Sequence, residues 1–320
     1  MLNATPDNQI ARAMAIMVAA MIFAPVMDAI AKMLATRFDV SPATVTLGRF
    51  VVQSVFLFVF LVFAWSRKSL PVYVSKVNIL RGMIMGLAAM LFFTALKYMP
   101  LADAISVFFV EPIIVMLMSA AFLGEKVGWR RLVAACIGFA GAIIVIRPSY
   151  ELFGVVSLLP LCTAFLFSIY LILTRVSGGN DDPLIMQFFA GIGGVLICSV
   201  ILSIGTPLGV EDFSLSLPQE NRAWALLLGI GLFAVSSHLL IVFAFSMAPA
   251  SILAPFQYIE IVSATLFGLI LFGEFPDATK WVGIFIIIGS GVYIFLREKQ
   301  LEKKDKAKIN HDPALTVQQP

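Results

Sequence analysis

Apolar runs of about twenty residues follow one another along almost the whole chain. They are separated by short polar breaks and lie at about residues 11–36, 43–66, 77–97, 102–123, 129–147, 152–174, 184–206, 222–246, 251–272 and 279–297. A bilayer core about 30 Å thick needs about 20 apolar residues per helix. Lipid offers the backbone no hydrogen bonds, so runs of this length cross it as helices. The sequence therefore predicts an all-α polytopic membrane protein with ten transmembrane helices.

The composition excludes an ordinary soluble domain. Hydrophobic residues make up 60% of the chain and charged residues 13%, against roughly 45–50% and 25% in soluble proteins. The first run is too long for the apolar core of a signal peptide and nine further runs follow, so we expect it to remain as an uncleaved anchor. The cysteines, Cys136, Cys162 and Cys198, all lie in apolar runs without paired spacing. They are interpreted as core residues and not as a disulfide framework or a metal site.

One segment occurs twice. Residues 95–125 return as residues 244–274 with six identical positions, and each copy has a Pro before its apolar run, a Glu inside it and a Gly-Glu pair at its end. Because an odd number of predicted spans separates the copies, the second should enter the membrane from the opposite side. This predicts two inverted five-helix repeats, at residues 11–147 and 152–297. Residues 1–10 would precede them, and the charged tail at 298–320 is expected to be disordered.

The duplicated Glu residues, Glu111 and Glu260, are the first candidates for a substrate-binding or coupling site. Each is the tenth residue of its predicted span, about 14 Å from the helix start at 1.5 Å per residue, so both should lie near the midplane. A charged group at that depth costs roughly 2.5–3.5 kcal/mol, and we expect at least one of the two to carry a proton through part of a cycle. The alternative is an interhelical hydrogen bond that only locks the bundle.

Three further charges should lie toward one membrane face. Asp28 is near the end of the first span, Arg49 is near the start of the second, and Lys32 follows Asp28 by four residues, a spacing that puts both on one helix face. Lone charges in a membrane are costly, whereas a paired and hydrogen-bonded set is tolerated. We predict a partly buried cluster of Asp28, Arg49 and Lys32 that fixes two helices together or meets an anionic group of a cargo.

The remaining polar candidates have structural alternatives. His238 lies inside the eighth predicted span, where a buried histidine satisfied by its neighbours is the alternative. Gln257 and Tyr258 precede Glu260 and could offer a hydrogen bond and a stacking face to a ligand, although Tyr258 could equally pack. Asp103, one turn into the fourth span, is expected to cap its helix, because an acid suits a helix N-terminus.

Proline residues interrupt four of the predicted spans, at Pro25, Pro112, Pro160 and Pro255. Each removes a backbone donor. Such breaks are tolerated where protein or a cavity satisfies the freed groups. They are consistent either with a binding site or with kinks for packing.

Lys and Arg residues orient the bundle. With the N-terminus inside, fifteen of them flank the inner ends of the spans, Arg81 among them, and five flank the outer ends, among them Lys280. The positive-inside rule then places both termini in the cytoplasm. The net charge of +3 reflects this orientation, and no basic patch interleaved with aromatic residues suggests nucleic acid.

An intramembrane enzyme is the rival class. It would need an HExxH zinc motif, paired aspartates, or a Ser and a His held by a third group. The chain has two histidines and no HExxH, one lone Asp pair at 181–182 in a turn, and Ser237 beside His238, where adjacent positions point to different helix faces. No GxxxxGK[ST] loop supports ATP coupling. We therefore expect no enzyme, no cofactor and no metal, and the midplane carboxylates disfavour a pure scaffold.

The ordered set of motifs resembles the drug/metabolite transporter (DMT) superfamily, EamA type. The residues that carry the resemblance are Pro100, FFVEP at 108–112, LGE at 123–125 and GFAGAIIVIRP at 138–148, within a match to residues 11–297. Each motif is short, but their order is specific. The resemblance implies a secondary transporter with ten helices, two inverted five-helix repeats and a central cavity that opens alternately to each side.

The same resemblance leaves the cargo open. Members of this superfamily carry amino acids, riboflavin, S-adenosylmethionine, nucleotide sugars or amphiphilic drugs. The first spans of the two halves differ, since Asp28 and Lys32 have Leu166 and Tyr170 as counterparts, so the cavity should be asymmetric. We expect an importer of an aromatic or cationic metabolite, riboflavin-like or S-adenosylmethionine-like, in the bacterial inner membrane. Export of amino acids or amphiphilic drugs is the alternative. The expected partners are a small-molecule substrate and membrane lipids, with no nucleic acid and with a homodimer left open.

Overall fold

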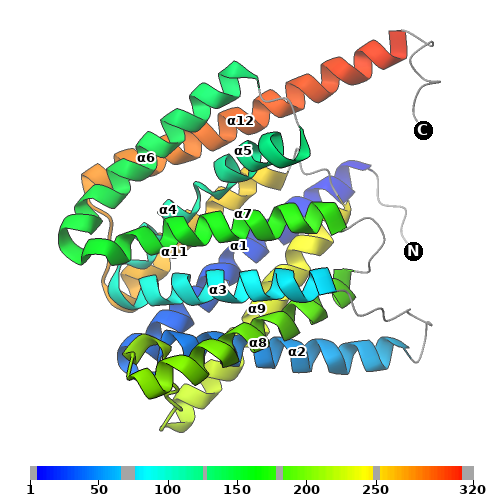
Figure 1. Cartoon of the computed structure of the whole chain (residues 1–320). Coiled ribbons are helices and arrows are strands. Elements are labelled where there is room, and N and C mark those ends of the chain that lie inside the picture. The colour runs from blue at the N-terminus through cyan, green and yellow to red at the C-terminus, as the bar shows by residue number, and fades with distance from the viewer. Residues whose placement is uncertain (1–5, 66–75, 125–127, 178–182, 248–252, 312–320) are drawn as a thin grey trace.

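The computed structural model describes residues 6–65, 76–124, 128–177, 183–247 and 253–311 of the 320-residue chain. Within these ranges every regular element is a helix and none is a strand. Helix α1 begins and helix α12 ends at the same end of the bundle (Figure 1). We call this the terminal end and the opposite one the far end. The expected all-α class is confirmed for the described residues.

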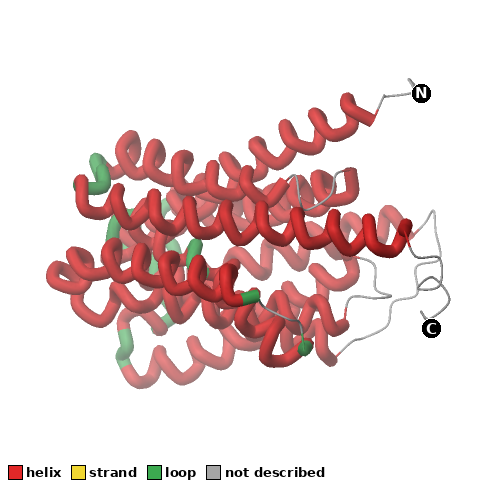
Figure 2. Tube along the Cα trace, turned by 90° about the horizontal axis from the view of Figure 1, so that it is seen from above, coloured by secondary structure: helices red, strands yellow, loops and turns green. Residues whose placement is uncertain are grey.

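The helices follow one another with short connections. The first part of the chain forms α1 (Pro6–Arg37), α2 (Pro42–Trp65), α3 (Lys76–Tyr98), α4 (Leu101–Phe108), α5 (Glu111–Leu123) and α6 (Trp129–Phe153). The second part forms η1 (Gly154–Leu158), α7 (Leu159–Ser177), α8 (Pro183–Leu208), η2 (Glu211–Phe213), α9 (Asn221–Met247), η3 (Ala254–Tyr258), α11 (Ile259–Phe267), η4 (Gly268–Phe272) and α12 (Ala278–His311). Seen from above in Figure 2, the long helices lie side by side between the two ends of the bundle.

Many of these helices have the length and apolar character of membrane spans. In the described part of the chain seven satisfy both criteria: Ile10–Arg37, Pro42–Phe63, Lys76–Tyr98, Leu101–Phe122, Ser149–Thr174, Leu184–Leu208 and Asn221–Ile241. Shorter apolar helices, Leu132–Ile146, Phe256–Phe272 and Ala278–Tyr293, fall within the other predicted spans. Large apolar side chains such as Phe63 and Ile270, 73% and 74% exposed, lie on the outside, where lipid would cover them. The prediction of a polytopic membrane protein is confirmed.

The fourth predicted span is long and apolar enough as a whole, Leu101–Phe122, but its helix is interrupted near the middle. After Phe108 a two-residue turn separates α4 from α5. Pro112 has no amide hydrogen to donate to the carbonyl of Phe108, and the amide of Ile113 donates instead to the oxygen of Val110 at 3.0 Å. The ninth predicted span is likewise divided into η3, α11 and η4, and Pro255 lies in η3. The helix is therefore irregular at equivalent places in both copies, within two residues before their Glu residues.

The two copies also end alike. Gly124 and Gly273 follow the last helical residue with a left-handed backbone, φ +69° and +70°, which glycine adopts without a Cβ clash. The start of the first copy lies beside the end of the second, because the amide of Leu101 donates to Oε2 of Glu274 at 3.1 Å. Glu125, the counterpart of Glu274, lies outside the described residues.

The charged tail differs from the prediction. Residues from 298 onward were expected to be disordered, but α12 continues as a helix to His311. This stretch consists mainly of Glu, Lys, Gln, Leu and Ala, which have high intrinsic helix propensity. A helix can thus extend beyond the apolar part of α12 without further packing, and residues 312–320 lie outside the described ranges.

Close backbone packing sets the position of α3. A Cβ atom on Gly82 would lie 2.0 Å from the carbonyl oxygen of Ala190 in α8, and one on Gly193 would lie 2.1 Å from the carbonyl oxygen of Ile79. Only glycine permits this approach, as in other membrane helix pairs with small residues at the contact. The contact fixes the rotation of α3 and with it the face that α3 turns toward α7.

Candidate functional site

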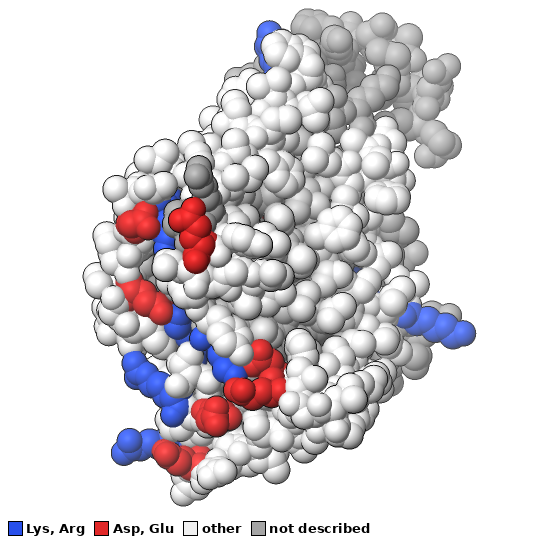
Figure 3. All heavy atoms as spheres, turned by 60° about the vertical axis from the view of Figure 1, so that its left-hand side comes forward, with Lys and Arg blue, Asp and Glu red and all other residues white. Residues whose placement is uncertain are grey.

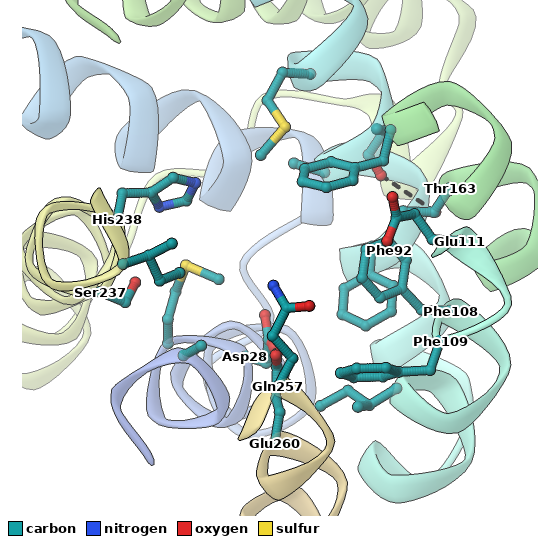
Figure 4. Close-up of a pocket in the computed structure, with 18 of the residues that line it drawn as sticks. Asp28, Phe92, Phe108, Phe109, Glu111, Thr163, Ser237, His238, Gln257 and Glu260 are labelled. Atoms are coloured by element: carbon teal, nitrogen blue, oxygen red, sulfur yellow. Dashed lines mark hydrogen bonds between the residues drawn. The ribbon is translucent and has the colours of Figure 1, made fainter. Parts of the chain in front are cut away.

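A cavity with a volume of about 190 Å³ lies among the helices of both halves of the chain. Its polar lining residues are Asp28 of α1, Arg49 of α2, Glu111 of α5, Thr163 of α7, Ser237 and His238 of α9, Gln257 of η3 and Glu260 of α11. Figure 4 shows His238 and Ser237 on one side of the cavity, Glu111 and Thr163 on the other, and Asp28, Gln257 and Glu260 between them. The cavity is smaller than typical ligand pockets of about 300–1,000 Å³, so in this conformation it has room only for a small molecule or part of one.

Aromatic rings form much of the apolar wall. The Phe108 ring packs against Phe92 and Phe167, with centroids 5.7 Å and 5.5 Å apart, and Phe93 and Phe109 also line the cavity. Sequence reasoning did not single out these residues or Thr163. For α3 the sequence does contain a usable pattern. Positions 85, 88 and 92 have helical spacing, which places them on one face of the helix.

The two duplicated carboxylates both lie in this cavity, each in the first turn of a helix that follows a break. Glu111 is the first residue of α5 and Glu260 the second residue of α11. A helix N-terminus favours negative charge, so the break gives each acid a better environment than the middle of a continuous helix. Among the described residues no side chain or backbone donor hydrogen-bonds either carboxylate. Asp28 is close enough to Glu260 to interact with it electrostatically.

Asp28 and Arg49 line the same cavity but form no ion pair within 4.0 Å in the described structure. Both are buried, at 4% and 3% exposure, and they attract each other electrostatically. The guanidinium of Arg49 lies 5.0 Å from the Phe50 ring centroid and 5.8 Å from that of Phe93. Its Nε is buried, and no described group accepts a hydrogen bond from it.

Lys32 does not join Asp28 and Arg49, contrary to the predicted cluster. Its Nζ donates to Oε1 of Glu274 at 2.5 Å and to the carbonyl oxygen of Met99 at 2.7 Å. Lys32 lies one turn beyond Asp28, about 6 Å further along α1 at 1.5 Å per residue, and this rise brings it to the far end. The Gly-Glu pair at the end of the second copy thus supplies an ionic partner through Glu274.

His238 and Ser237 both line the cavity, although adjacent positions were expected to point to different sides. Both groups lie at the same backbone acceptor, because Nδ1 of His238 is 2.8 Å and Oγ of Ser237 3.2 Å from the carbonyl oxygen of Ala234. A carbonyl only accepts, so Nδ1 donates, and in the neutral ring Nε2 then remains an acceptor. Ser237 and His238 are therefore not bonded to each other as a nucleophile and a base would be.

Gln257 lines the cavity, and Tyr258 does not. The Tyr258 ring packs against Phe109, with centroids 5.3 Å apart. A Cβ atom on Gly291 of α12 would overlap the Tyr258 hydroxyl, so this ring fills the space between η3 and α12. Of the two readings given to Tyr258, the geometry favours packing.

Asp103 does not cap α4. Its carboxylate accepts from Nζ of Lys280 at 2.6 Å and from Oγ of Ser149 at 3.2 Å, and α4 has no side-chain cap. Lys280 flanks the outer end of a predicted span in the sequence, but in the structure it is buried. The pair joins α4 to α12, which explains how both charges are tolerated inside the protein.

Charged side chains gather at the far end of the bundle. In Figure 3, which brings this end forward, Lys, Arg, Asp and Glu cluster on a surface that is otherwise uncharged. Besides the two pairs above, Nζ of Lys97 lies 2.7 Å from Glu211 and 2.8 Å from Asp212. The far end is thus held by ion pairs that connect helices of the two halves. No cluster of His, Cys, Asp and Glu that could hold a metal occurs in the described ranges.

Comparisons with known proteins agree with this architecture. The family model of the EamA-like transporter family matches residues 11–147 and 154–296. A riboflavin transporter of Vibrio cholerae is 26% identical over 88% of this chain and 92% of that protein. An S-adenosylmethionine uptake transporter of Rickettsia bellii is 27% identical over 87% of this chain and 91% of its own length.

Two further matches name no cargo. An uncharacterized transporter of Helicobacter pylori strain J99 is 30% identical over 70% of this chain and 75% of that protein. A solved crystal structure superposes with a TM-score of 0.60 at 17% identity, covering 89% of this chain and 98% of the other. At that identity the likeness supports the fold alone.

Proposed function

Because this chain belongs to the EamA-like transporter family, we propose that it is a secondary transporter that binds a small organic metabolite in the cavity and moves it by alternating access. The family and its relatives are membrane transporters and not enzymes. The observation that carries the proposal is a membrane-embedded cavity whose acids, Asp28, Glu111 and Glu260, receive no hydrogen bond from any described residue. Burying such groups costs several kcal/mol each, which a ligand that pairs with them would offset.

The proposed architecture is ten transmembrane helices arranged as two inverted five-helix repeats. Three observations support it: the family model matches twice, both copies break before their Glu residues, and Leu101 at the start of one copy contacts Glu274 at the end of the other. Inverted repeats place a binding site near the midplane at the repeat interface. The cavity has residues from both halves, as this arrangement requires.

The proposed cargo is an aromatic or cationic metabolite that enters the cell. The Phe rings of the wall offer stacking faces, and three carboxylates against one Arg in the cavity favour a cationic group. Relatives named as riboflavin and S-adenosylmethionine uptake transporters support import of compounds of this kind. Export of amino acids or amphiphilic drugs remains the second candidate, since the same rings and acids would suit an amphiphilic amine.

A ligand screen tests this function. Purified full-length protein would be heated with vitamins, nucleosides, amino acids and quaternary amines, and its unfolding midpoint measured. We expect stabilisation by one chemical class and loss of that stabilisation in Glu260→Gln. Uptake of the hit into cells or proteoliposomes, compared with efflux, then separates import from export. A hit class without transport in either direction would contradict the proposal.

A further inference from the structure

Arg81 of α3 is a buried cation that lies outside the cavity lining. Its side chain is 2% exposed, although its place near the start of α3 suggests a loop charge. Nη1 donates to Oδ1 of Asn78 at 2.7 Å, and the guanidinium carbon lies 4.9 Å from the centroid of the Tyr170 ring. Nε is buried, and no described group accepts a hydrogen bond from it.

Arg81 continues a stripe of residues that line the cavity. Met85, Ala88 and Phe92 all line it, and Arg81 precedes them by four, seven and eleven residues, the spacing of one helix face. Because α3 runs from the terminal end to the far end (Figure 1), Arg81 lies about one turn nearer the terminal end than Met85.

Tyr170 continues the facing stripe on α7. Thr163 and Phe167 line the cavity, and Tyr170 follows them at helical spacing toward the terminal end. Tyr170 also interacts electrostatically with Arg49 inside the cavity. The Tyr170 ring, 4.9 Å from the guanidinium carbon of Arg81, thus connects the cavity-lining face of α7 with Arg81.

The rotation of α3 that points Arg81 at α7 follows from the backbone contact of Gly82 and Gly193 with the opposite helices. Rotating α3 so that Arg81 moved away from α7 would require the backbones of α3 and α8 to separate. Arg81 is thus held at this position by packing.

The buried cations among the described residues fall into two groups. Lys32 and Lys280 at the far end each have a carboxylate within hydrogen-bond distance. Arg49 and Arg81 have none within 4.0 Å in the described structure, and each keeps an unpartnered, buried Nε. A buried charge without a counter-ion is strongly unfavourable. Lys32 and Lys280 therefore each have a carboxylate partner within the fold, whereas Arg49 and Arg81 each keep a donor that could bind an anion.

We propose that Arg81, backed by Tyr170, is a second anion-binding point at the terminal end of the cavity, and that with Arg49 it selects a cargo carrying a carboxylate or a phosphate. This rests on the proposed function and narrows it, since the cavity acids would then meet the cationic part of a zwitterionic cargo. A guanidinium suits both anions, because its donors form a planar fork that matches their oxygen atoms. Arg81 would meet the anion at the terminal end and Arg49 deeper in the cavity.

The test compares pairs of compounds that differ by one anionic group, adenosine with adenosine 5′-monophosphate and phenylalaninamide with phenylalanine. Apparent affinities for the full-length protein come from thermal stabilisation against ligand concentration. We expect the anionic member of at least one pair to bind the wild type more tightly. The adenosine pair tests recognition of a phosphate, and the phenylalanine pair tests recognition of a carboxylate.

Variants then locate the preference. Arg81→Gln should weaken binding of the anionic member by about tenfold or more, as for a lost charge-assisted hydrogen bond, and leave the neutral member unchanged. Arg81→Lys keeps the positive charge but lacks the planar fork of donors, so its affinity for the anionic member should fall severalfold. Arg222→Gln, which removes an exposed Arg, is the matched control and should behave as wild type.

Two results would overturn the inference: no anion preference in the wild type, or an unchanged preference in Arg81→Gln. If Arg81→Gln does not fold, Arg81→Lys decides, and an equal loss for both members of a pair would count against anion recognition. Should Glu260→Gln abolish transport while Arg81→Gln keeps the wild-type preference, the proposed function stands and only this inference fails.

Discussion

At the scale of single residues, the two duplicated acids have different surroundings. Pro112 follows Glu111 and forces the break before α5, whereas Ile261 follows Glu260. Asp28 interacts electrostatically with Glu260, and Tyr258 with Glu111. Only Glu260 of the two thus has a second carboxylate as a neighbour in the described structure, so the two acids should not be interchangeable in binding or in proton exchange.

Glu111→Gln and Glu260→Gln should each leave the protein folded in the membrane and lower transport severely, by about tenfold or more, as expected when a charged partner of a ligand is lost. Their pH profiles should differ, because only Glu260 has Asp28 beside it. Transport assays from acidic to alkaline pH measure this. Glu220→Gln, at an exposed position, is the control, and wild-type profiles in both variants would leave only a structural role.

Asp28 and Arg49 should be coupled although they form no direct ion pair. Each single change, Asp28→Asn or Arg49→Gln, leaves the other charge buried without an opposite charge nearby. The loss of stability or transport in the double variant should therefore be smaller than the sum of the losses in the two single variants. We expect a coupling energy on the order of 1 kcal/mol in stability or transport. Additive losses in a double-mutant cycle would show that the two charges act independently.

At the scale of elements, the far end is closed by contacts between the halves. Lys32 of α1 binds Glu274 after η4, and Lys280 of α12 binds Asp103 of α4. Lys32 and Arg37 also lie 5.1 Å and 5.4 Å from the Phe272 ring centroid. In a protein that works by alternating access, these contacts would have to separate before the cavity could open at this end.

A charge exchange tests the Lys32 contact. Lys32→Glu alone places two acids together and should lower both the unfolding temperature and transport. Adding Glu274→Lys restores opposite charges and should recover much of the stability. The recovery should be incomplete, because the hydrogen bond that Lys32 donates to the carbonyl oxygen of Met99 is lost. The measurement is thermal unfolding of the purified variants. A double variant no more stable than Lys32→Glu would show that the pair does not hold this end.

At the scale of the whole molecule, the loop charges indicate orientation. Arg81 and Lys280, one from each set counted in the sequence, are buried, so the excess of positive charge at the terminal end is unchanged. We therefore keep the proposal that both termini are cytoplasmic, in the inner membrane.

A pair of C-terminal fusions measures this orientation. A fluorescent-protein fusion should be bright, because that protein folds in the cytoplasm, and an alkaline-phosphatase fusion should be inactive. The reverse pattern would place the terminal end outside the cell.

The pattern of apolar runs and buried polar residues was enough to identify the class of fold and most of the candidate site. Apolar runs of span length allow only helices in lipid, and the duplicated Glu residues mark equivalent positions in two copies. Asp28, Arg49, His238 and Gln257 could be selected because polar groups inside apolar runs are costly. They line one cavity with Glu111 and Glu260.

Which of these residues contact one another depends on how the helices pack. Lys32 shares a helix face with Asp28, yet its partner Glu274 is 242 residues away in sequence, and no periodicity predicts such a contact. Arg81 resembles a loop charge by position and is buried because Gly82 and Gly193 bring α3 and α8 together. Spacing along a helix gives the face of a residue, but helix packing determines what that face contacts.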